Sequence, residues 1–267
     1  MQRIVCILFS VLLVCSACEF KLRPNNDEQE VGRVSIERYD RLQSRYLLTG
    51  DFSALQQMNT EYPIETRTLV EKMLQIGDVG DHNINERFLR FYQDSTLQAL
   101  ISDAESEYAN MDDLNDRFRS AFGLLRKWIP GFPLPRLYAQ IGAFDQSIVV
   151  GEKVIGISLD KYMGAKYPLY QRFGYSPEQL NSMKRSYIVP DALVFYLLSL
   201  YPMPNYDRRT QMEKDLHMGK VMWTVNKATG AKTFNTDYVN IVDRYMRRHP
   251  KTTVASLLET DNYASLR

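Results

Sequence analysis

The chain has 267 residues, of which 45% are hydrophobic and 24% are charged. This composition is that of an ordinary globular protein, and it excludes a collagen-like, coiled-coil or wholly disordered chain. The formal net charge of +1 argues against a nucleic-acid-binding protein, because such proteins need a strongly basic surface. The length suits one large domain or two small ones, with enough residues to bury a sizeable core.

The first 18 residues predict an export signal that ends at a lipid-modified cysteine. Arg3 is followed by an apolar run over residues 4–14, and then by Ser16-Ala17-Cys18. The run is too short to remain as a transmembrane helix, which needs roughly 20 residues. A cysteine after two small residues is typical of bacterial lipoprotein signals, so we expect residues 1–17 to be removed and Cys18 to be acylated. The alternative is a plain signal peptide with an incidental cysteine at this position.

The rest of the chain predicts a tether followed by one domain. All three cysteines lie within the first 18 residues, so the domain has no disulfide and no catalytic thiol. Residues 18–33 are polar and lack an apolar period, which indicates a flexible tether between lipid and domain. No linker or repeat divides residues 34–267, so we expect a single domain there.

Apolar spacing between Val34 and Trp128 is helical. Helices are predicted to follow Ser53, Asn85, Ser95 and the pair Asp112-Asp113, and a further apolar stripe over 69–74 ends at Gly77.

The middle of the chain carries the only strong β signal. A strand is predicted over 134–142, and the runs 146–150 and 153–158 predict a hairpin around the turn Gly151-Glu152. Helices then resume: one over 191–201 with Pro190 as its first residue, one after Asp207 that Gly219 interrupts, and two shorter ones over 237–248 and 252–258. The expected fold is therefore α+β, mostly helical, around a small central sheet.

Several short motifs occur in a fixed order along this chain. They are Ser35-Ile-Glu-Arg-Tyr-Asp40, Glu61-Tyr-Pro63, Trp128-Ile-Pro130, Leu159-Asp-Lys-Tyr-Met-Gly164, Ile188-Val-Pro-Asp191 and Arg244-Tyr-Met246. The ordered set resembles the GldB family of gliding-motility lipoproteins from Bacteroidetes, except that the segment between Asn226 and Tyr238 is shorter than usual. The resemblance implies a short strand at the first motif and an outer-membrane lipoprotein that serves gliding and secretion in gliding species.

The resemblance also implies a distant likeness to zinc metallopeptidases of the zincin type. Their ligand helix carries His-Glu-x-x-His, with two imidazoles one turn apart and a general base between them. The corresponding helix here reads Asp191-Ala-Leu-Val-Phe195, and the chain's three histidines (His82, His217 and His249) are far apart in sequence. We therefore expect no metal. Nucleophile elbows, phosphate loops and dinucleotide fingerprints are also absent from the sequence, so no cofactor is expected.

Five polar residues fall in the region that corresponds to a zincin cleft: Asp160, Tyr162, Arg185, Asp191 and His217. One interpretation is structural: both aspartates cap helices, and Arg185 pairs with one of them. The other is a polar pocket kept for binding.

Three functions remain open from the sequence. The first is a catalytically inactive, lipid-anchored scaffold that binds envelope proteins, with membrane lipid at Cys18 as its other partner. The second is an envelope hydrolase with an unrecognised site, and the third is a module that binds glycan or peptidoglycan fragments. Residues 19–23 lack the clustered acids that export lipoproteins to the cell surface in this phylum, which favours the periplasmic face of the outer membrane.

Overall fold

The computed structural model describes residues 30–266. The predicted signal, Cys18 and most of the predicted tether lie outside the described residues. The last tether residues contact the domain: Glu30 forms an ion pair with Arg126 at 2.8 Å, and Val31 packs against the core.

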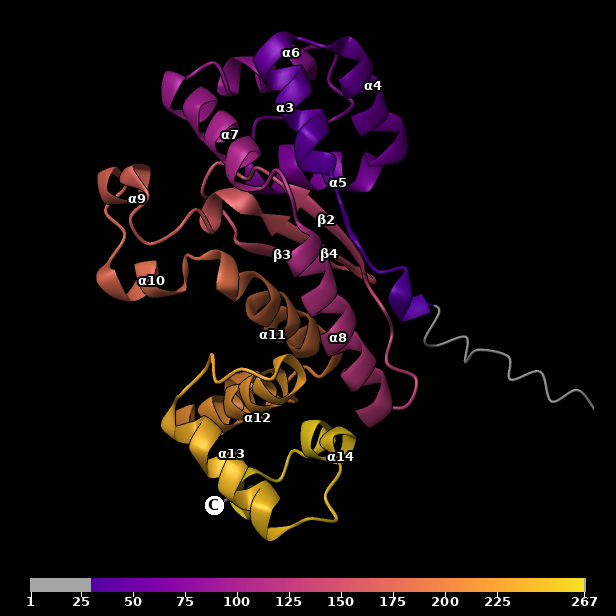
Figure 1. The fold of residues 1–267 in the computed structure, drawn as a ribbon, viewed down its shortest axis with the longest axis vertical. Helices are drawn as coiled ribbons and strands as arrows, with labels where there is room; N and C mark the ends of the chain where they lie inside the picture. The colour runs from indigo at the N-terminus through magenta and orange to yellow at the C-terminus, as the bar shows by residue number, and fades with distance from the viewer. Residues whose placement is uncertain (1–29, 267) are drawn as a thin grey trace, which may run out of the picture.

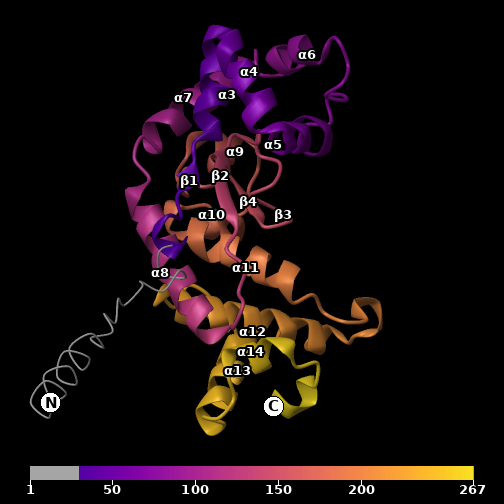
Figure 2. The same cartoon turned by 90° about the vertical axis from the view of Figure 1, so that its right-hand side faces the viewer.

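A four-stranded mixed sheet lies at the centre of the molecule, in the order β1-β2-β4-β3 (Figures 1 and 2). Strands β1 (Ile36–Glu37) and β2 (Arg136–Gln140) pair in parallel, and β2 also pairs in parallel with β4 (Val154–Ser158). Strand β3 (Ile148–Gly151) forms the antiparallel edge. The expected α+β fold, mostly helical around a small sheet, is confirmed.

The hairpin turn differs from the prediction by one residue. Gly151 pairs with Val154, so the turn is Glu152-Lys153 and Gly151 ends the strand. A Cβ atom at Gly151 would come within 2.8 Å of the Val154 side chain, which explains a glycine inside the ladder. Lys153 takes the positive φ of 54° that the turn requires.

The N-terminal helices form one body above the sheet in Figure 1. The starts predicted after Ser53 and Ser95 are two residues and one residue late, because Asp51 and Asp94 are the capping residues and each accepts hydrogen bonds from two backbone amides of the first turn. The helices are α3 (Tyr39–Thr49), α4 (Phe52–Glu61), α5 (Pro63–Arg67), a π-helix (Thr68–Met73), α6 (Ile84–Phe91) and α7 (Ser95–Glu107).

Two long helices join this body to the C-terminal helices. Helix α8 (Asp112–Trp128) follows α7, and α11 (Ile188–Leu200) contacts β3, β4 and α8. Helix α11 begins two residues before Pro190, the predicted first residue, so Pro190 lies third in its first turn, where a missing N–H costs no helical bond. The short helices α9 (Pro168–Arg172) and α10 (Pro177–Ser182) lie between β4 and α11 in the chain.

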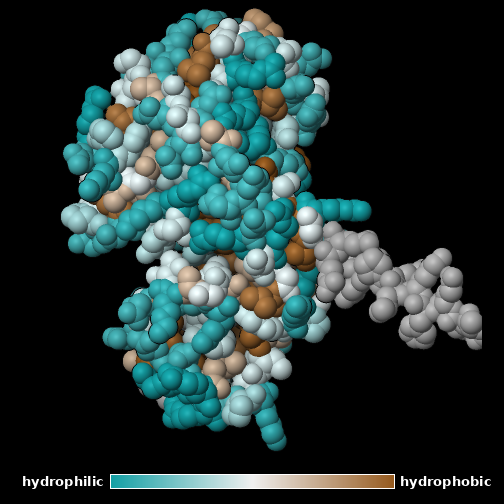
Figure 3. All heavy atoms as spheres, in the orientation of Figure 1, coloured by the Kyte–Doolittle hydropathy of each residue, from teal (hydrophilic) through white to brown (hydrophobic). Residues whose placement is uncertain are grey.

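The C-terminal helices pack beneath α8 and α11 in Figure 1. Helix α12 (Gln211–Thr229) runs through Gly219 without the predicted interruption, and this glycine lies against the start of α13 (Asp237–Arg248). A Cβ atom at Gly219 would lie 2.9 Å from that of Tyr238. Helix α14 (Val254–Glu259) closes the fold. On the face drawn in Figure 3, hydrophilic residues predominate and apolar ones are scattered.

Candidate functional site

The parallel strands β2 and β4 end side by side, and this brings the loop after β2 against the turn after β4. Asp160 lies in that turn and is fully buried. Its two carboxylate oxygens accept hydrogen bonds from the amides of Gly142 at 2.7 Å and Phe144 at 2.6 Å. Ala143 and Phe144 have φ values of 51° and 66°, a left-handed conformation that the carboxylate stabilises. Burial raises the pKa of Asp160, and the two amide bonds oppose that shift.

Tyr162 and Asp191, two of the five predicted polar residues, lie side by side. The Tyr162 hydroxyl donates to Asp191 Oδ2 at 3.0 Å, and both residues line a small cavity of about 160 Å³. Lys161 and Tyr175 also line it, with the Lys161 ammonium 3.0 Å from the Tyr175 hydroxyl. Burial raises the pKa of Asp191 to about 7, and the Tyr162 hydrogen bond opposes the rise. A carboxyl with its pKa raised to this range is suited to act as a general acid or base.

Arg185 lies outside this cavity and pairs with neither Asp160 nor Asp191. Its guanidinium contacts the Asp113 carboxylate at 2.6 Å, donates to the carbonyl of Asn110 at 2.7 Å and stacks 5.0 Å from the ring centre of Tyr108. The prediction that Arg185 pairs with Asp160 or Asp191 is therefore wrong, because the turn before α11 points the guanidinium at the start of α8. Arg185 fastens this turn to the α7–α8 junction.

The two aspartates are not N-caps either. Asp160 binds loop amides, and Asp191 lies inside the first turn of α11, after Tyr187 at the cap position. Because α11 starts at Ile188, the carboxylate of Asp191 is too far into the helix to cap it.

His217 belongs to a different part of the molecule. It lies on α12, beside the backbone of Tyr201 at the C-terminal end of α11. Asp191 lies at the other end of α11, about 15 Å away along the helix axis. Its Nδ1 is 3.0 Å from the Tyr263 hydroxyl, and burial together with nearby Lys220 lowers its pKa to about 4. Tyr162 and Asp191 thus share a cavity that Arg185 and His217 do not line.

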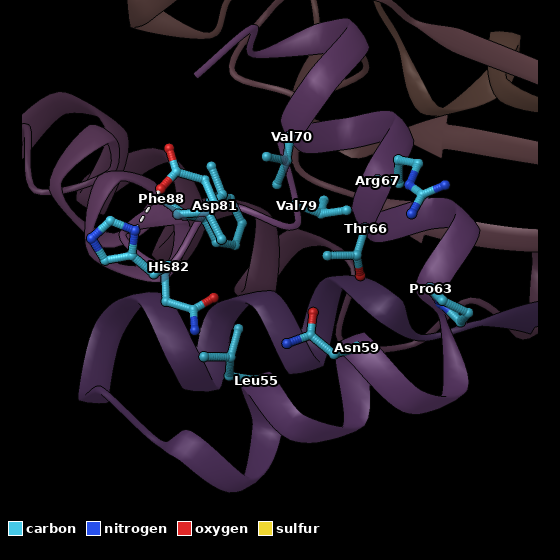
Figure 4. A pocket seen from close by; sticks show the side chains of 12 residues that line it. Leu55, Asn59, Pro63, Thr66, Arg67, Val70, Val79, Asp81, His82 and Phe88 are labelled. Atoms are coloured by element: carbon cyan, nitrogen blue, oxygen red, sulfur yellow. Dashed lines mark ion pairs between the residues drawn. The ribbon is translucent and has the colours of Figure 1, made fainter. Parts of the chain in front are cut away.

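A larger cavity of about 440 Å³ lies among the N-terminal helices, away from every predicted residue (Figure 4). Leu55 and Asn59 of α4 point across it toward Thr66 and Val70 in Figure 4. No sequence motif marks it, because its walls come from four helices; a π-helix, which is frequent at functional sites, forms one of them. The lining residues are Leu55, Asn59, Pro63, Thr66, Arg67, Val70, Val79, Asp81, His82, Ile84, Asn85 and Phe88.

Within residues 30–266, no three His, Cys, Asp or Glu side chains lie close enough together to hold a metal ion. None of the helices in this part of the chain combines the length and the apolar character needed to cross a bilayer.

Comparison with known proteins gives one match. The family model described as gliding motility protein GldB matches residues 21–236, which include the sheet, α11 and α12 and end just before α13. No curated protein matches, and no solved structure matches. The chain therefore belongs to the GldB family of gliding-motility lipoproteins, a membership that implies a membrane-anchored place in the cell envelope.

Proposed function

We propose that this protein is anchored in the outer membrane through acylated Cys18, with its domain on the periplasmic face, and that it acts as a catalytically inactive scaffold for envelope proteins. A zincin-like ancestry is part of the proposal. The β3–β4 hairpin precedes α11 as the edge hairpin of a zincin precedes its ligand helix, and α11 carries Asp191 and Phe195 at the ligand positions.

The observation that carries the scaffold proposal is how the predicted polar residues are used. Both oxygens of Asp160 bind loop amides, Arg185 binds Asp113 and a backbone carbonyl, and His217 contacts Tyr263. These bonds join segments far apart in sequence, so their effect is to stabilise the fold. An enzyme instead leaves its acid, base or nucleophile directed at a bound substrate.

Complementation of a deletion strain tests the scaffold. We expect Tyr162→Phe and Asp191→Asn to restore the envelope or secretion phenotype whenever their thermal melts match the wild type. Asp145→Asn, at an exposed residue outside the cavity lining, is the matched control. Stable cavity variants that uniformly fail to complement would overturn the scaffold and direct the search to a substrate.

The anchor has its own test. Cys18→Ala should release the protein from membranes or leave its signal uncleaved, whereas Cys15→Ala should change neither. Intact anchoring of the Cys18 variant, or digestion of the domain by protease added to intact cells, would contradict the anchor or the periplasmic placement respectively.

The Tyr162–Asp191 cavity is the observation that favours the alternatives, an envelope hydrolase or a module for glycan or peptidoglycan fragments. Its carboxyl has a pKa near neutrality, and the ring of Tyr175 and the amide of Gln179 are groups that bind sugars. Titrating the protein with peptidoglycan fragments and following the Tyr162 and Asp191 signals by NMR separates the scaffold from these alternatives. The scaffold predicts no shift at these residues.

A further inference from the structure

The C-terminal helices carry a groove that none of the predicted functions uses. It has a volume of about 260 Å³ and runs between α12 and α13, the pair at the bottom of Figure 1. Its lining residues are Met212, Leu216, Tyr238, Ile241, Arg244 and Arg248. Small-molecule sites usually occupy about 300–1,000 Å³, so this groove suits one or two apolar side chains rather than a whole ligand.

The floor of the groove is apolar. Leu216 is buried, Ile241 is partly buried, and Met212 has 42% of its surface exposed at one end. A partner that covered these side chains would remove apolar surface from water, which is favourable by about 25 cal/mol per Å² before the costs of association.

The rim of the groove carries two arginines without an anionic partner. Arg244 and Arg248 are exposed and lie four residues apart, so they share one face of α13. Among the residues that the structure describes, no carboxylate lies within ion-pair distance of either guanidinium. Arg247, between them in sequence, instead pairs with Asp243 at 2.6 Å. Two charges on one rim are thus left available to a second molecule.

The charge around the groove fits an acidic partner. Residues 201–266 contain ten Lys and Arg against seven Asp and Glu, whereas residues 30–128 contain twelve against seventeen. The excess of positive charge at the C-terminal end steers acidic molecules toward this region. Guanidinium groups also bind carboxylates in a planar, two-point geometry that fixes orientation.

A protein segment fits these features better than a membrane surface does. Sites that bind anionic bilayers carry clusters of about 4–8 basic residues, with about 1 kcal/mol from each. Among the described residues, two arginines without a carboxylate partner lie on this rim, and a flat bilayer would leave the groove between them unfilled. An acidic segment with carboxylates one helical turn apart would reach both guanidinium groups while an apolar side chain enters the groove.

We propose that the α12–α13 groove binds an acidic segment of a protein partner, with Arg244 and Arg248 holding two carboxylates and the groove taking an apolar side chain. This inference rests on the proposed function, in which the protein acts through protein contacts, and it names the surface and the chemistry of the partner. The match to the family model ends at residue 236, so α13 supplies four of the six lining residues from outside the matched segment.

The test uses the full-length protein in mild detergent and a fluorescent helical peptide that carries two Glu residues four positions apart beside Leu residues. The control probes are the same peptide with Lys in place of Glu, and vesicles of phosphatidylglycerol. We expect the acidic peptide alone to bind, and its affinity to fall as salt rises. The double variant Arg244→Glu/Arg248→Glu should weaken binding at least tenfold, and Met212→Glu should weaken it while leaving both arginines in place.

A matched variant controls for net charge. Arg208→Glu/Lys232→Glu makes the same change in charge at two exposed residues outside the groove and should bind the peptide nearly as well as wild type does. The proposal is overturned if the acidic peptide does not bind, if both double variants lose binding equally, or if vesicles bind through the arginines and the peptide does not. Failure of the scaffold in complementation would leave this peptide result unchanged, so the two proposals fail separately.

Discussion

The region where β2 and β4 end and the α12–α13 groove both combine charged side chains with a cavity, yet they use their charges in opposite ways. At the sheet, Asp160 and Arg185 each have two or more partners within the chain. At the groove, Arg244 and Arg248 have no carboxylate partner among the described residues, while Arg247 beside them has one. A buried charge must be compensated inside the fold, whereas an exposed one can remain free for another molecule. The comparison separates charges that hold the fold together from charges that are available for binding.

Helix α11 connects the two regions, and truncating its core should have the largest effect. Leu193 and Leu197 are fully buried, so either change to Ala removes packing and leaves a cavity. We expect each to lower the free energy of unfolding by about 2–5 kcal/mol in denaturant titration. Phe195→Ala, at a residue 46% exposed on the same helix, is the control and should cost much less. Equal losses at the three positions would mean that α11 is not packed as described.

Removing the Asp160 carboxylate should have the next largest effect. Asp160→Ala leaves the amides of Gly142 and Phe144 unpaired and releases a loop with left-handed residues. Each unsatisfied buried group costs about 1–3 kcal/mol, so the two amides together predict a loss of about 2–6 kcal/mol. The exposed Asp145 in the same loop is the control, and Asp145→Ala should be nearly neutral. A stable Asp160 variant that fails to complement would move this residue from structure to function.

The third prediction concerns how the free energy of unfolding depends on pH through Asp191. The unfolded chain loses the Asp191 proton near its ordinary pKa of 3.8 and the folded protein only near 7, so this residue's contribution falls as pH rises from about 4 to 7. The full shift corresponds to about 4 kcal/mol, and about half is expected because the residue is only partly buried.

The lowered pKa of His217 makes the protein more stable as pH rises from about 4 to 6.5, which opposes the effect of Asp191. The quantity to compare is therefore the free energy of unfolding of Asp191→Asn minus that of the wild type at each pH. The Asn variant should gain stability relative to wild type by about 2 kcal/mol between pH 4 and pH 8. A difference that stays constant over this range would show that Asp191 is ionised throughout.

Truncating one arginine in each region should have the smallest effects on stability, and it compares the two regions directly. Arg185→Ala should lower the free energy of unfolding by about 1 kcal/mol, since it removes hydrogen bonds that join the turn before α11 to the α7–α8 junction. Arg244→Ala should change it by less than about 0.5 kcal/mol. Thermal melts of the two variants at one pH are sufficient, and equal losses would erase the distinction between the two regions.

The sequence by itself determined the elements whose signals are local. The apolar runs over 146–150 and 153–158 around a Gly-X turn predict the hairpin, and the apolar period predicts α8 and α13. The ordered motifs predict the GldB family, which the family match confirms. Errors at element ends stayed within a few residues, because caps such as Asp51 and Asp94 compete with neighbouring serines for the same amides.

Only the tertiary structure decided which polar residues meet. Asp160, Arg185 and His217 share a stretch of sequence with Tyr162 and Asp191, yet each points toward a different neighbour: the loop after β2, the start of α8 and the C-terminal turn around Tyr263. The α12–α13 groove likewise depends on Gly219 meeting Tyr238, a close contact between two helices. Long-range contacts of this kind leave no period or spacing in the chain, because the partner of each side chain is chosen by how the helices pack and not by its neighbours in sequence.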